Sequence, residues 1–146
     1  MLIAVLNGPN LNLLGKRNPQ VYGKMTMEQV MLDIQRQWFG IQFVYFQSNH
    51  EGALIDRIQE IAESGKYAGI VINAGGYAHT SVALRDAVEY AGEQGITVLD
   101  LHISDIRQRE DFRQVDLLTD KCAHTIIGHG TNGYKEAVEF IINSHH

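Results

Sequence analysis

The feature that most constrains this chain is a regular alternation of short apolar runs with segments of helical periodicity. The apolar runs have the length and composition of buried strands and lie at residues 2–6, 41–46, 68–73, 96–101 and 125–127. Apolar residues recur at helical spacing after each of the first three runs, in a short turn around 117–118, and over 134–141. Five such alternations imply right-handed strand–helix–strand units. They therefore predict an α/β chain with a parallel sheet covered by helices on both faces.

Capping signals set the bounds of the first helix. Thr26 is followed three residues later by Gln29, the pattern of a capping box. Apolar residues then recur at helical spacing to Phe39, so we expect a helix over 26–39 that stops at Gly40.

Similar signals mark the next two helices. Ser48 and Glu51 have the spacing of a second capping box, and Gly65 is placed to end the helix that follows. Thr80 or Ser81 can cap the third helix.

Composition limits the class of protein. The 146 residues are 45% hydrophobic and 20% charged, which is typical of a globular protein, and we expect one domain over 1–146. The net charge of −5 argues against a nucleic-acid-binding protein. No apolar run approaches the ~20 residues that span a bilayer, so no membrane partner is predicted. Cys122 is the only cysteine, so no internal disulfide can form, and we expect a cytoplasmic protein.

Three polar stretches follow strands of the predicted sheet. The first, over 6–23, holds both prolines of the chain, three glycines and four asparagines, so it favours turns. The others are 73–81 and 102–113. Ligands bind beyond the carboxyl ends of strands in such folds. The side chains that this brings together suit a small, hydroxylated, anionic ligand: Asn10, Arg17, Tyr22, Asn73, His79, His102, Ser104, Arg109 and Arg113.

The sequence shows no pattern typical of a metal site. A His-x-x-x-His pair and clustered carboxylates are both missing, and His79 and His102 lack a further pair of ligands at a recognisable spacing. We therefore predict no metal.

Four motifs in register resemble one known family. They are LNGPNLNLLGKRNPQVYG at 6–23, FQSNHEG at 46–52, INAGGYAHTSVALRDA at 72–87 and HISDIRQREDFR at 102–113. Together they resemble the type II 3-dehydroquinate dehydratases. The resemblance implies a flavodoxin-like three-layer sandwich with strand order 2-1-3-4-5.

The resemblance also implies a reaction. The family dehydrates 3-dehydroquinate to 3-dehydroshikimate by anti elimination through an enol or enolate, with no metal, Schiff base or other cofactor. This lyase serves the shikimate pathway or quinate catabolism, and family members form trimers that associate into a homododecamer.

Four residues match the family's catalytic positions. Tyr22 matches the base; a free tyrosine, with a pKa of about 10, is a poor base, and a neighbouring cation such as Arg17 favours the phenolate. His102 matches the acid that protonates the leaving hydroxyl, and Asn10 matches a residue that holds a water against the enolate. A loop-packing aromatic at Tyr22 and a satisfied histidine at a strand end are the plainer alternatives.

The other matches are binding positions. The backbone amides of Ile103 and Ser104, with the Ser104 hydroxyl, match the family's carboxylate site. Asp86 matches a residue that reaches the neighbouring subunit's site. Arg109 stays open between substrate contact and an ion pair with Glu110 or Asp111. The family's contacts to the ring hydroxyls of the substrate correspond to Asn73, His79 and Arg113 in this chain.

The chain departs from the family pattern at several positions. The family usually has glutamate at the position of Asp100, where a carboxylate would orient His102, and asparagine at the position of Asp105. The stretches 107–108 and 114–116 also differ from the usual His-Ala and His-rich sequences. If Asp100 does not hold His102, Asp105 is the first alternative partner.

Two other functions fit the same fold class. A flavodoxin-like module could bind flavin or a regulatory phosphate, although the first loop lacks a Ser/Thr-rich phosphate cradle and no acidic pair marks a phosphoacceptor. A dehydratase-like scaffold without activity is the second alternative, and only an assay separates it from the enzyme.

Overall fold

The computed structural model describes residues 1–145, and its centre is a five-stranded parallel sheet. The strands lie in the order β2-β1-β3-β4-β5, and every neighbouring pair is parallel. This confirms the predicted fold class and strand order. The strands are β1 (Leu2–Asn7), β2 (Gln42–Gln47), β3 (Gly69–Asn73), β4 (Thr97–His102) and β5 (His124–Ile127).

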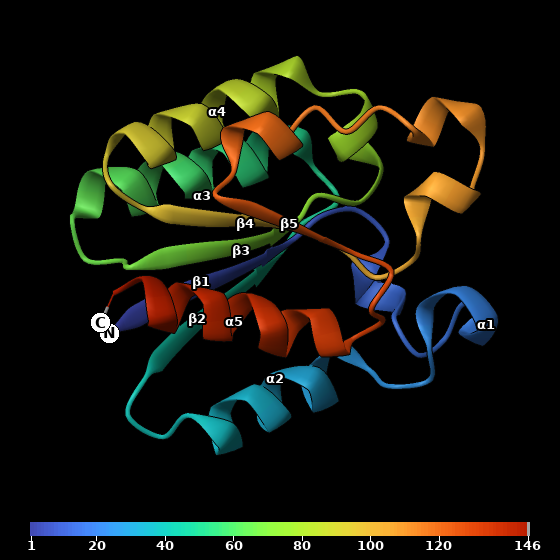
Figure 1. The fold of residues 1–146 in the computed structure, drawn as a ribbon, viewed down its shortest axis with the longest axis horizontal. Helices are drawn as coiled ribbons and strands as arrows, with labels where there is room; N and C mark the ends of the chain where they lie inside the picture. Colours follow the sequence, from blue (N-terminus) through green and yellow to red (C-terminus); the bar gives the residue numbers. More distant parts are fainter. Residues whose placement is uncertain (146) are drawn as a thin grey trace.

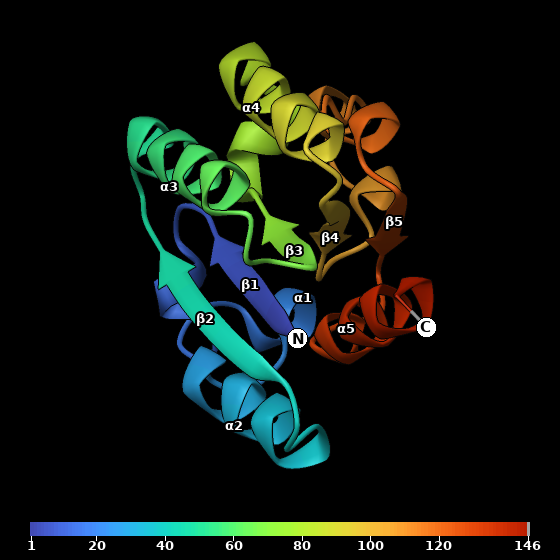
Figure 2. The ribbon, with the colours of Figure 1, turned by 90° about the vertical axis from the view of Figure 1, so that its left-hand side faces the viewer.

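Helices cover both faces of the sheet. The pair α3 and α4 lies on one face and the pair α2 and α5 on the other, which gives three layers (Figures 1 and 2). The short α1 lies beyond the carboxyl ends of the strands (Figure 1). The helices are α1 (Pro19–Tyr22), α2 (Met27–Gln37), α3 (Glu51–Ser64), α4 (Val82–Glu93) and α5 (Asn132–Ser144).

The alternation of side chains along the strands builds two apolar layers. On β1, Ile3 and Val5 pack in the layer that contains α2 and α5, whereas Ala4 and Leu6 pack in the layer that contains α3 and α4. All four side chains are fully buried. Strands covered on both faces are apolar along most of their length, which explains why they appear in the sequence as nearly continuous apolar runs.

The predicted start of α2 is correct, but its predicted end is not. Thr26 and Gln29 form the reciprocal capping box, so its start is confirmed. The helix ends at Gln37, however, where the Trp38 N–H closes the last turn on Ile34, and Gly40 lies beyond it. The prediction that Gly40 stops the helix is therefore wrong, because the chain leaves helical geometry at Trp38.

The prediction of a second capping box, at Ser48 and Glu51, is also wrong. The Ser48 hydroxyl accepts from the N–H of His50 at 3.0 Å, so it turns the chain before α3 instead of capping it. His50 is the capping position and makes no side-chain cap. The other two signals hold: Gly65 ends α3 with φ = 67°, and Ser81 accepts from the Leu84 N–H to start α4.

The loops after β1 and β3 touch at the point where the strand order reverses. The Gly8 N–H donates to the Asn73 carbonyl at 2.7 Å, and a Cβ on Gly8 would collide with the carbonyl group of Ala74. Only glycine permits this close approach. Three 3-10 turns connect β4 to β5: Ile106–Gln108 and Asp111–Arg113 lie at the same edge, and Thr119–Lys121 lies against α4 just before β5 (Figure 1).

Within residues 1–145, none of the helices is long and apolar enough to cross a membrane.

Candidate active site

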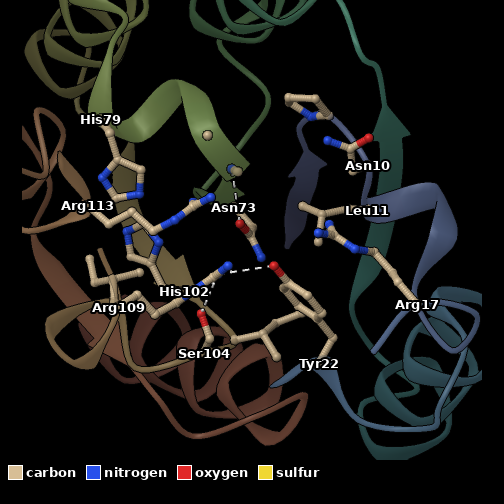
Figure 3. Close-up of a pocket in the computed structure, with 15 residues that line it drawn as sticks. Asn10, Leu11, Arg17, Tyr22, Asn73, His79, His102, Ser104, Arg109 and Arg113 are labelled. Atoms are coloured by element: carbon tan, nitrogen blue, oxygen red, sulfur yellow. Dashed lines mark hydrogen bonds between the residues drawn. The ribbon is translucent and has the colours of Figure 1, made fainter. Parts of the chain in front are cut away.

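A cavity of about 120 Å³ opens at the carboxyl edge of the sheet, between the loops that follow β1, β3 and β4 (Figure 3). The predicted convergence of the three polar stretches is therefore confirmed. All but one of the predicted catalytic and substrate-binding residues line the cavity: Asn10, Arg17, Tyr22, Asn73, His79, His102, Ile103, Ser104 and Arg113. Asp86 is the exception.

Tyr22 reaches the cavity from the last residue of α1, a four-residue helix inside the loop that the sequence indicated as irregular. The Asn18 side chain caps this helix and Pro19 occupies its first position, where a missing N–H costs nothing. Arg17 lies over the Tyr22 ring, with its guanidinium carbon 4.2 Å from the ring centroid. The expected cation is present, but it contacts the face of the ring.

Arg109 is the arginine that binds the Tyr22 hydroxyl. Its Nη1 donates to the Tyr22 oxygen at 3.0 Å and to the Ser104 hydroxyl at 3.3 Å (Figure 3). Its Nε also lies 3.7 Å from Oε1 of Glu110, which confirms the ion-pair alternative, while substrate contact by Arg109 stays a prediction. A guanidinium donating to a phenolic oxygen stabilises negative charge there. The sequence offered no signal for this contact, because 87 residues separate the partners.

His102 ends β4 and is 96% buried against two carboxylates. Its Nε2 donates to Oδ2 of Asp116 at 2.8 Å and lies 3.4 Å from Oδ1 of Asp100. The predicted neighbour Asp100 is thus present, but Asp116 makes the hydrogen bond. Asp105 is wrong as an alternative partner because its carboxylate binds the Arg107 side chain at 2.9 Å.

The three buried groups shift one another's protonation. Burial would by itself lower the pKa of His102, but Asp100 and Asp116 outweigh it and raise that pKa to about 9. Burial raises the pKa of Asp100 to about 7, and Asp116 acts in the same direction. Burial opposes ionisation of Asp116 too, yet its contacts with His102 and Asp100 hold its pKa well below the usual range. At neutral pH His102 is therefore a cation against an ionised Asp116.

His79 faces His102 from the turn after β3. The two rings are stacked with centroids 5.8 Å apart. Nδ1 of His79 donates to the carbonyl of Val115 at 2.7 Å, which fixes the proton on that nitrogen. Nε2 is then the atom through which the ring can contact a ligand.

Asn73 is held from behind by a buried polar network. Its Nδ2 donates to the hydroxyl of Tyr134 at 3.2 Å, and its Oδ1 accepts from the Gly75 N–H at 3.2 Å. Tyr134 in turn donates to Oδ1 of Asn7 at 2.8 Å. The nitrogen and the oxygen of the Asn73 side-chain amide are therefore both oriented before any ligand enters.

Asn10 and Arg113 line opposite sides of the cavity (Figure 3). Asn10 is the one non-glycine residue with positive φ among residues 1–145, at 71°, a conformation that asparagine tolerates well. Its N–H donates to the Asn49 side chain. The guanidinium of Arg113 pairs with Glu110 at 3.2 Å.

Asp86 lies on the exposed side of α4, outside the cavity of its own chain. This position leaves its expected contact with a neighbouring subunit untested in one chain.

Asp100, His102 and Asp116 are also the one His/Cys/Asp/Glu group within residues 1–145 close enough to hold a metal ion, with ligand atoms within 4.8 Å of one another. Sequence spacing gave no sign of this group, since 16 residues separate the carboxylates. A cationic imidazole against two carboxylates already accounts for its charge, so we assign no ion to it.

Comparison with known proteins identifies the family that has this arrangement. Residues 1–142 match the family described as Dehydroquinase class II. The chain belongs to the class II dehydroquinase family. This overturns the alternative of a flavin- or phosphate-binding module.

Similar dehydroquinases match at least 95% of the chain. The chain is 48% identical over 141 residues to the catabolic 3-dehydroquinase 1 of Neosartorya fischeri, covering 95% of this chain and 91% of that protein. It is 46% identical to a 3-dehydroquinate dehydratase of Prochlorococcus marinus, covering 97% and 95%. A crystal structure of a type II dehydroquinase from Butyrivibrio crossotus shares 40% identity and a TM-score of 0.92 over 97% of each chain.

Proposed function

We propose that this dehydroquinase removes water from 3-dehydroquinate to give 3-dehydroshikimate, with Tyr22 as the base and His102 as the acid. One observation carries the assignment. A phenol with a guanidinium on its oxygen and a buried, carboxylate-bound imidazole line the same cavity. Elimination of water next to a ketone needs this combination of a base for a carbon acid and an acid for the leaving hydroxyl.

Proton transfer at Tyr22 starts the reaction. The phenolate, stabilised by Arg109 and covered by Arg17, takes a proton from the carbon adjacent to the ketone. The electron pair of that C–H bond forms a double bond to the carbonyl carbon, and the π electrons of the C=O bond move onto the oxygen to give an enolate. A water held by Asn10 donates to the enolate oxygen and stabilises its charge.

Proton transfer from His102 completes the reaction. The imidazolium gives its proton to the hydroxyl on the next carbon, the C–O bond breaks, and water leaves. The enolate electrons form the carbon–carbon double bond conjugated with the ketone. Tyr22 holds the abstracted proton and His102 lacks one, so exchange with solvent restores both groups.

The polar residues that line the cavity orient the substrate. The carboxylate is placed at the amides of Ile103 and Ser104, beside the Ser104 hydroxyl. The ring hydroxyls are placed against Asn73, His79 and Arg113, and the pre-oriented Asn73 amide supports this role. Such fixed donors reduce the entropy lost in reaching the reactive geometry.

The assembly is also part of the proposal. Asp86 is exposed on α4, which suits a residue that completes the site of a neighbouring subunit in a trimer. Four such trimers would form the dodecamer that the family resemblance implies.

The chemistry uses no cofactor or metal, and a single cysteine suits a cytoplasmic protein of shikimate biosynthesis or quinate breakdown.

A direct assay tests the activity. Purified protein mixed with 3-dehydroquinate should produce the ultraviolet absorbance of a conjugated enone. A protein that is folded by circular dichroism and forms no enone would instead be the inactive scaffold.

A further inference from the structure

The segment between β4 and β5 places the carboxylate of Asp116 against His102. The expected partner, Asp100, lies too far from the ring to make the same hydrogen bond. We propose that Asp116 is the positioning residue that orients His102 and keeps it ready to donate its proton. The proposal rests on the proposed function, because it concerns the acid of that reaction.

The distances separate the two carboxylates. Asp116 Oδ2 is 2.8 Å from His102 Nε2, a normal length for a charge-assisted hydrogen bond. Asp100 Oδ1 is 3.4 Å away and, within residues 1–145, makes no hydrogen bond although it is fully buried. The other oxygen of Asp100 has only the hydroxyls of Thr119 and Thr125, each at 3.5 Å. Asp100 is therefore a neighbouring carboxyl group without a hydrogen bond to the ring, while Asp116 defines the direction of the ring.

Asp116 is itself fixed in place. Its second oxygen, Oδ1, accepts from the N–H of Leu118 at 2.9 Å. With Oδ1 bound to the backbone and Oδ2 bound to the imidazole, both oxygens of the carboxylate have one defined partner. The carboxylate therefore cannot rotate without breaking a hydrogen bond.

The backbone around Asp116 is clamped to the turn after β3 and to α4. The Val115 carbonyl accepts from His79, and the Leu117 N–H donates to the Ala78 carbonyl at 2.8 Å. The Leu117 carbonyl accepts from Arg85 at 2.8 Å. His79 thereby faces the cavity with one nitrogen and holds the positioning segment with the other.

The orientation of the ring follows from these contacts. Because Nε2 binds Asp116 on the side away from the cavity, Nδ1 is the nitrogen available to the leaving hydroxyl. A carboxylate on one imidazole nitrogen fixes the tautomer and stabilises the cation, as second-sphere carboxylates do for histidines elsewhere. The other ionisable groups near His102 are Asp100 on its own strand, His79, Cys122 behind the carboxylates, and Arg109 and Arg113, which line the same side of the cavity (Figure 3).

Four proteins test the proposal: the wild type, Asp116→Asn, Asp116→Ala, and Asp116→Ala combined with Asp100→Glu. The combined variant lets a longer side chain at position 100 cover the extra 0.6 Å that separates 3.4 Å from 2.8 Å. Each protein is measured for kcat, for KM, and for the protonation of His102 by NMR of labelled imidazole. Asp120→Asn is the matched control, because Asp120 belongs to the same segment but pairs with Arg85.

We expect Asp116→Asn to lower kcat by about 10- to 100-fold, with KM within about twofold and the His102 pKa lowered in parallel. The combined variant should recover most of the loss in both kcat and pKa. Asp120→Asn should match the wild type.

The proposal is overturned if Asp116→Asn keeps wild-type kcat, or if kcat and the His102 titration change independently in any folded variant. The NMR titration needs no substrate. A wild type that forms no enone would therefore refute the proposed function while the pairing of Asp116 with His102 is still measured.

Discussion

Arg109 donates a hydrogen bond of 3.0 Å to the hydroxyl of Tyr22, which lies in a different loop. The loop after β1 and the loop after β4 are thus joined through the reacting atom of the proposed base. The arginine closer in sequence, Arg17, contacts the ring and not the oxygen. The two guanidiniums should therefore contribute differently.

The first prediction compares these two arginines. Arg109→Gln should lower kcat at neutral pH by about 100-fold, because removing one hydrogen-bond donor from an oxyanion in a site closed to water typically lowers kcat by that factor. Arg17→Gln should lower kcat less, because cation–π stacking over a partly exposed ring is worth about 1 kcal/mol. Steady-state assays of both variants decide the order, and a larger loss for Arg17→Gln would reverse the assignment.

The second prediction concerns the base itself. Tyr22→Phe keeps the ring under Arg17 but removes the hydroxyl, so the fold should survive and kcat should fall by at least about 100-fold. Tyr67→Phe, on a partly buried tyrosine outside the cavity, is the matched control. Near-wild-type kcat in Tyr22→Phe would remove the phenol from the mechanism.

The third prediction follows from the pKa of His102. Because the folded pKa of about 9 exceeds the unfolded value of about 6.5, folded protein holds an extra proton between these pH values. Stability from this group is complete below pH 6.5 and is lost as the pH rises through about 9. The free energy of unfolding should fall by up to about 1.4 kcal/mol per pH unit within that window.

Urea denaturation between pH 6.5 and 9.5 measures this slope. His102→Gln should reduce it, whereas His50→Gln, on an exposed histidine, should not. Turnover should fall above pH 9 as the acid loses its proton, and a kcat that stays constant to pH 10 would contradict the pKa of about 9.

The fourth prediction concerns metals and imines. Activity should survive EDTA, because His102 and Asp116 hydrogen-bond to each other and the cationic imidazole offsets the negative charge of the carboxylates. It should also survive borohydride in the presence of substrate, since no lysine lines the cavity among residues 1–145. Loss of activity with EDTA and recovery with a divalent cation would show that the three-residue group holds an ion.

The fifth prediction concerns assembly. Light scattering should give a mass near twelve chains at assay concentration, and Asp86→Ala should weaken substrate binding although Asp86 lies outside its own cavity. Glu93→Ala, at the end of the same helix, serves as the control. A fully active monomer would refute both the dodecamer and the role of Asp86.

The sequence predicted the sheet well because its signals are local. Continuous apolar runs mark strands covered on both faces, and Thr26, Ser81 and Gly65 form the caps that their positions indicate. The two failures, at Gly40 and Ser48, arose where the chain leaves or enters a helix two or three residues away from the signal. Helix ends depend on where the chain must turn, which tertiary packing decides.

The candidate site was predicted less completely. The parallel topology was enough to bring three loops together, but not to pair side chains across them. Arg109 reaches Tyr22 and Asp116 reaches His102 only because the segment after β4 folds back over the turn after β3. Neither contact has a fixed spacing in sequence, so no pattern could have indicated it.

The Tyr134 hydroxyl joins Asn7 and Asn73, which lie 127 and 61 residues away in the chain. The consequence concerns the order of synthesis on the ribosome. Every loop of the site is translated before α5, so the hydrogen bonds that join Asn7 and Asn73 through Tyr134 form only when α5 packs against the sheet. A buried polar group without a partner costs about 1–3 kcal/mol. The last helix to be translated is therefore the one that completes the floor of the site.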